Sequence, residues 1–108
     1  MSKTMFRQGD VLLLQEATRP PRLVPRTAAT ADLILAYGER TGHSHRVSAK
    51  DSTLCESEDD ESGQAWLEVL RETNLRHEEH SPIALPVGVY RVILQRRYDP
   101  SSDLPAND

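Results

Sequence analysis

The strongest β-strand signal in the sequence is the segment VYRVILQRRY, residues 89–98. It is rich in β-branched and aromatic residues, which favour an extended backbone, and apolar side chains occupy both its odd and its even positions. The preceding LPVG, residues 85–88, supplies the proline and glycine of a compact turn. These residues therefore predict a β-strand that is entered directly from a turn.

Shorter segments of similar character occur along the rest of the chain, separated by residues typical of turns. The predicted strands cover Asp10–Gln15, Leu33–Tyr37, His43–Val47, Ser52–Glu56, Trp66–Leu70 and Leu75–Glu79. We expect Leu33–Tyr37 and His43–Val47 to pair with each other or to continue across a bulge. Ala17–Ala31 contains three prolines, which lack the backbone N–H that strands and helices donate, so it is predicted as a loop or an irregular edge.

A helix over Ala65–His80 is the alternative to the strands Trp66–Leu70 and Leu75–Glu79. Its leucines would lie roughly on one face, and Glu and Arg favour helices. The turn and the strong strand that follow favour two strands, hinged near residues 72–74.

Many short strands, turns rich in Pro, Gly and Asp, and little helix predict a mainly β fold, a small antiparallel β-barrel or sandwich. The 108 residues correspond to a single domain, residues 1–108. We expect an ordered core at about residues 6–99 and a flexible tail over residues 100–108, which are rich in Pro, Ser, Asn and Asp. With 37% hydrophobic and 5% aromatic residues, the core is expected to be small and aliphatic.

Charge and cysteine content exclude several classes of protein. The net charge of −4 disfavours a nucleic-acid partner, although Arg19, Arg22, Arg26 and Arg46 could form a local basic face. No apolar run approaches the roughly 20 residues of a membrane-spanning helix, and the start of the chain has no signal-peptide core, so we expect a cytoplasmic protein without a membrane segment. Cys55 is the single cysteine and is expected to be a structural or incidental thiol.

All four histidines occur in two short segments, TGHSHRV at residues 41–47 and LRHEEHSP at residues 75–82. Side chains alternate along a strand, so His43 and His45 share one face. If Leu75 faces the core, the same alternation sends His77 and Glu79 inward. In neighbouring strands these four side chains could converge on one divalent ion, with zinc, iron, manganese and nickel as candidates.

The sequence leaves some roles in this cluster open. If the chain turns at Glu79, His80 replaces Glu79 or His77 as the inward group. Glu78 could orient an imidazole. Glu79 is the fourth ligand or a general base, which makes it the candidate catalytic residue, and whether the protein is an enzyme stays open. In the competing interpretation, the histidines titrate at an interface and bind no metal.

Two resemblances add to these expectations. GHSH at residues 42–45, the second His/Glu segment and LPVGVY at residues 85–90 loosely resemble the layout of single-domain cupins, which implies a cupin-like barrel with one metal site. The strings QGDVLLL (residues 8–14), TGHSHR (41–46), HEEHSPI (77–83) and the segment 85–100 are similar to a group of small, uncharacterised bacterial and phage proteins. That second resemblance implies no activity.

The leading hypothesis is therefore a cytoplasmic metal-binding β-barrel protein, with an enzyme of unknown substrate as one form of it. Its metal ligands are drawn from His43, His45, His77, Glu79 and His80. The alternative is a non-enzymatic accessory protein of a phage or mobile element that acts as a homo-oligomer or on a larger partner. Exposed strand edges and a small core favour such assembly.

Overall fold

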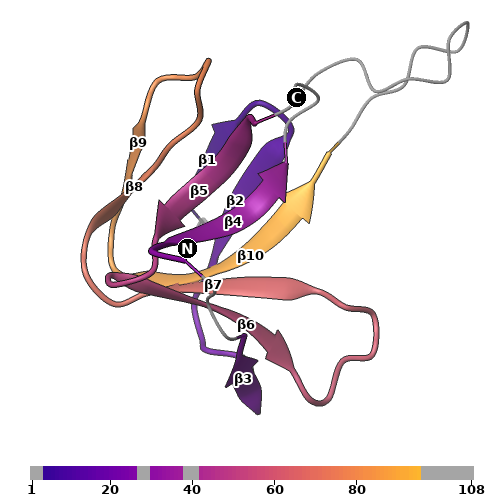
Figure 1. The fold of residues 1–108 in the computed structure, drawn as a ribbon. Helices are drawn as coiled ribbons and strands as arrows, with labels where there is room; N and C mark the ends of the chain where they lie inside the picture. The colour runs from indigo at the N-terminus through magenta and orange to yellow at the C-terminus, as the bar shows by residue number, and fades with distance from the viewer. Residues whose placement is uncertain (1–3, 27–29, 38–41, 96–108) are drawn as a thin grey trace, which may run out of the picture.

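The computed structural model describes residues 4–26, 30–37 and 42–95, which form ten β-strands and no helix (Figure 1). The mainly β prediction is confirmed. The helical alternative over Ala65–His80 is wrong, because β7 (Ala65–Val69) and β8 (Thr73–Leu75) occupy that segment. Accordingly, none of the described residues belongs to a helix that could cross a membrane. The end of the predicted strand Val89–Tyr98 and the predicted tail at 100–108 lie outside the described residues.

Six strands form the main antiparallel sheet. Their order across the sheet is β1 (Met5–Gln8), β2 (Val11–Glu16), β10 (Gly88–Leu94), β7, β6 (Ser52–Ser57) and β3 (Leu23–Pro25). β10 contains most of the segment with the strongest strand signal, and it pairs with β2 on one side and β7 on the other. β3 is a three-residue edge strand inside the region predicted as a loop or an irregular edge.

Two further pairs of strands complete the described fold. β4 (Asp32–Tyr37) pairs antiparallel with β5 (Ser44–Ser48) across a bulge between Ile34 and Ala36, which confirms the predicted pairing. β8 pairs with β9 (Ile83–Leu85). The hydrogen bonds of residues 4–26, 30–37 and 42–95 define these three antiparallel sheets without a closed barrel.

One apolar core is shared by all three sheets. Tyr90 and Val92 of β10 lie opposite Leu67 and Leu13 in the neighbouring strands, and all four side chains are buried. The β4–β5 pair lies in front of β2 and β10 (Figure 1) and contributes Leu33, Ala36 and Val47 to the same cluster. Leu75 and Leu85 join it from the β8–β9 pair. Burial of each large aliphatic side chain contributes about 1.5–3 kcal/mol, so this core holds the three sheets together.

The structure corrects the strand predicted over Leu75–Glu79. β8 ends at Leu75, Arg76 forms an isolated bridge, and residues 77–82 lie outside any strand. β1 and β9 were not predicted, because each is short and lacks a regular alternation of apolar and polar residues. The turn after β8 contains His77 and His80.

Candidate metal centre

The two histidine segments meet through a single β-bridge. Arg46 of β5 and Arg76 after β8 exchange two backbone hydrogen bonds, with N···O distances of 3.0 and 2.9 Å. Because residues on antiparallel strands run in opposite directions, this bridge sets His45 opposite His77. The sequence predicted that the histidine side chains would converge if the two segments were neighbours. The bridge makes them neighbours.

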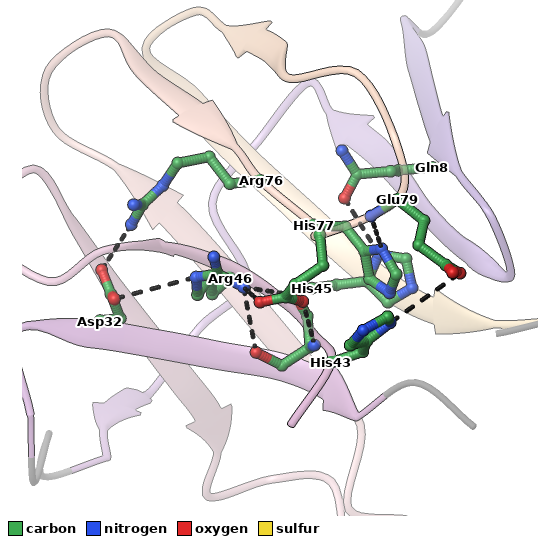
Figure 2. A network of polar contacts seen from close by, with 10 residues as sticks. Gln8, Asp32, His43, His45, Arg46, Arg76, His77 and Glu79 are labelled. Atoms are coloured by element: carbon green, nitrogen blue, oxygen red, sulfur yellow. Dashed lines mark hydrogen bonds and ion pairs between the residues drawn. The ribbon is translucent and has the colours of Figure 1, made fainter. Parts of the chain in front are cut away.

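Figure 2 shows His43, His45 and His77 close together, and ring contacts with His45 and His77 place His80 in the same cluster. The ring centroids of His45 and His77 are 4.3 Å apart, and those of His77 and His80 are 4.7 Å apart. The ring centroid of His43 lies 5.6 Å from that of His77, and the ring centroid of His80 lies 5.8 Å from that of His45. His45 is fully buried and His77 is 6% exposed, so the cluster extends from the core toward the surface.

His45 lies between Gln8 and Asp10. Its Nδ1 is 3.0 Å from the Gln8 side-chain oxygen Oε1, and its Nε2 is 3.4 Å from Asp10 Oδ1. The side chains of His45 and Asp10 are 0% and 1% exposed. An imidazole nitrogen and a carboxylate oxygen therefore face each other in a buried environment, an arrangement that can hold a positive charge between them.

A tight hairpin turn brings Gln8 and Asp10 to the cluster. β1 and β2 are joined by Gly9 and Asp10, with Gln8 opposite Val11. Gly9 has a φ of 57°, and it occupies the first central position, where a type II′ turn requires glycine. Gln8 and Asp10 are each 3% exposed. Asp10 was predicted only as the start of a strand, and its one sequence signal was an acidic residue placed directly before a run of four apolar residues.

His77 has a different hydrogen-bonding state from His45. The backbone N–H of Glu79 donates to His77 Nδ1 at 3.0 Å. Nδ1 is therefore an acceptor, so in the neutral imidazole Nε2 carries the hydrogen. His77 Nε2 can bind a metal ion only after the hydrogen bond from the Glu79 N–H to Nδ1 is given up.

His43, Glu79 and His80 form the outer part of the cluster. His43 Nδ1 lies 3.8 Å from Glu79 Oε2, and these side chains are 22% and 39% exposed. His80 is partly buried. The chain turns in this segment, so His80 joins His77 and Glu79 at the cluster and does not replace either of them.

Ion pairs beside the cluster fix the position of β5 relative to the turn. Glu78 Oε1 accepts a hydrogen bond from the Ser44 backbone N–H at 2.9 Å, and Oε2 accepts one from Arg46 at 2.6 Å. Together these contacts lower the pKa of Glu78 to about 2, with the Ser44 N–H as the largest cause. Asp32 of β4 pairs with Arg46 and Arg76 (Figure 2). The sequence left open that Glu78 orients an imidazole, and its described hydrogen bonds tie the turn to β5.

Replacing Glu78 by glutamine (E78Q) is expected to lower the free energy of unfolding at neutral pH and to have no effect in acid. The lowered pKa means that the Glu78 carboxylate stabilises the fold above about pH 4.5, and this contribution is lost as the pH falls toward 2. Urea denaturation of both proteins over this range would measure the difference. A difference that stays constant throughout would contradict a role for the Glu78 charge.

One family model matches the chain. It describes a domain of unknown function, DUF8820, and matches residues 7–95. The chain belongs to this family. This membership agrees with the resemblance to an uncharacterised group, and the DUF8820 match includes Gln8, Asp10 and all four histidines. No curated protein and no solved structure matches the chain.

The histidine cluster of this chain contains two sets of possible ligand atoms, an inner pair and a second set of three residues. Two atoms bound to one zinc ion in a tetrahedral site lie about 3.4 Å apart. His45 Nε2 and Asp10 Oδ1 already have this separation, at 3.4 Å. In the second set, ligand atoms of His43, His77 and Glu78 lie within 4.8 Å of one another.

Proposed function

We propose that this protein binds one divalent transition-metal ion between His45 Nε2 and Asp10 Oδ1. The observation that supports this most is the inner pair itself: two buried side chains, 3.4 Å apart, with Gln8 occupying the other nitrogen of His45. Histidines that bind metal commonly donate their second N–H to an oxygen in this way.

The distance favours an ion over a proton between the two groups. A hydrogen bond between a charged imidazole and a carboxylate is ordinarily about 2.7–2.9 Å long. The separation of 3.4 Å is longer than this and fits the distance between two ligand atoms of one tetrahedral metal ion. The spacing is therefore closer to that of two ligand atoms bound to one ion than to that of a hydrogen bond.

The surrounding donors suit borderline and hard first-row ions. Imidazole nitrogens and carboxylate oxygens dominate the cluster, a donor set compatible with zinc, iron, manganese or nickel. We propose that His43, His77 and His80 supply the remaining ligands or hydrogen bonds. An ion with an open position could polarise a bound water, and Glu79 at the outer side is the proposed general base.

Metal uptake by the chelator-treated protein tests this function directly. We expect titration calorimetry to show one saturable zinc site per chain, with iron, manganese or nickel as competitors. Thermal or urea unfolding should show about 2.7 kcal/mol of added stability when free metal is 100 times the dissociation constant. The proposal would be refuted if none of the four metals gave a heat of binding or changed the free energy of unfolding.

A further inference from the structure

Gln8 connects three parts of the site through one side chain. It belongs to β1, at the start of the hairpin turn that contains Asp10. Its Nε2 donates to the backbone oxygens of Leu75 and Ser81, each at 3.0 Å, and its Oε1 faces His45 Nδ1. Leu75 and Ser81 flank the turn that contains His77 and His80, so the Gln8 amide also holds this turn against the hairpin.

These contacts fix the direction of the hydrogen bond to His45. A glutamine side chain has two N–H donors on Nε2 and one acceptor oxygen, Oε1. Two carbonyl oxygens can only accept, so they use the two donors and leave Oε1 toward the imidazole. Because Oε1 cannot donate, His45 Nδ1 must be the donor in the bond between them.

We propose that Gln8 is a positioning residue that holds His45 in the Nδ1–H form and so presents Nε2 as the metal-binding atom. A neutral imidazole can carry its hydrogen on either nitrogen, and with the hydrogen on Nε2 the lone pair would point away from Asp10. The consequence for metal binding rests on the proposed function. The hydrogen-bonded state of His45 does not, because it can be observed in metal-free protein.

Nitrogen NMR of the histidine rings in wild-type protein tests the first step. We expect long-range ¹H–¹⁵N correlations to show a hydrogen on His45 Nδ1 both without metal and with zinc bound, and zinc on Nε2. A metal-free His45 with its hydrogen on Nε2 alone, or zinc on Nδ1, would overturn the inference without any variant being made.

The substitution Gln8→Met (Q8M) tests the second step, since it keeps the length of the side chain and removes the amide. We expect His45 to lose its fixed Nδ1–H form and zinc affinity to fall by about 10–100-fold, the usual effect of losing an outer partner of a ligand. Gln64→Met (Q64M) is the matched control. Gln64 Nε2 also donates to two backbone oxygens, those of Ala65 and Val92 at 2.7 and 2.8 Å, and its described hydrogen bonds involve no histidine. Q64M should leave both measurements unchanged.

The outcomes separate this inference from the proposed function. In one outcome, no metal binds, but His45 carries its hydrogen on Nδ1 and loses this preference in Q8M. Gln8 then still positions the His45 hydrogen, and the proposed metal function fails. If zinc binds to wild type and Q8M alike and the His45 form is unchanged, the metal function stands and the role of Gln8 is overturned. If Q8M does not fold, the wild-type spectrum decides.

Discussion

Replacing Asp10 by asparagine (D10N) is expected to weaken zinc binding by about 1,000-fold. Changes to outer partners of a metal ligand already cost about 10–100-fold, and this substitution replaces a charged ligand carboxylate by a neutral amide, which is a much weaker ligand. The amide has nearly the shape of the carboxylate, so the hairpin turn should persist. Calorimetric titration with zinc measures the affinity, and circular dichroism checks that the strands remain.

Asp51→Asn (D51N) is the matched control for D10N. Asp51 also has a largely buried side chain, 18% exposed, and its carboxylate pairs with Arg71 at 3.3 Å. It precedes β6, in a different sheet from β5 and β8, so its loss should leave zinc affinity within about twofold of wild type. Equal binding by D10N and wild type would exclude the inner pair and leave His43, His77 and Glu78 as the group to be tested.

The sequence could predict the part of this site that depends on local patterns. Alternation along a strand identified His43 and His45 as one pair and His77 as an inward residue. Convergence of the two segments was conditional on their being neighbours, and the Arg46–Arg76 bridge supplies that condition. The strand β10 and the β4–β5 pairing were likewise visible, because β propensity and turn residues act over short distances.

The contributions of Gln8 and Asp10 could not be predicted in the same way. Gln8 lies 37 residues before His45, and their contact depends on how the main sheet and the β4–β5 pair pack. The positions of Glu79 and His80 depend on a turn, where the period of two that governs strands no longer applies. The tautomer of the neutral His77 ring is set by the backbone N–H of Glu79 within that turn, and residue types alone do not specify this contact.

Replacing Leu75 by alanine (L75A) is expected to lower the free energy of unfolding by about 2–5 kcal/mol and to weaken zinc binding about tenfold. Leu75 is fully buried in the shared core, and removal of such a side chain costs both transfer free energy and the cavity left behind. Its backbone oxygen accepts from Gln8, and His77 follows two residues later. Urea denaturation and zinc titration below the unfolding transition would measure the two effects.

Leu67→Ala (L67A) separates the stability of the core from the geometry of the site. Leu67 is equally buried, but it lies in β7 of the main sheet, opposite Tyr90 and Leu54. We expect a similar loss of stability with zinc affinity of the folded protein unchanged, because β7 contributes no side chain to the cluster. If both variants bind zinc like wild type, the position of β8 does not control the site. If both lose affinity equally, binding depends on the core as a whole, since a local effect through the Leu75 carbonyl would appear in L75A alone.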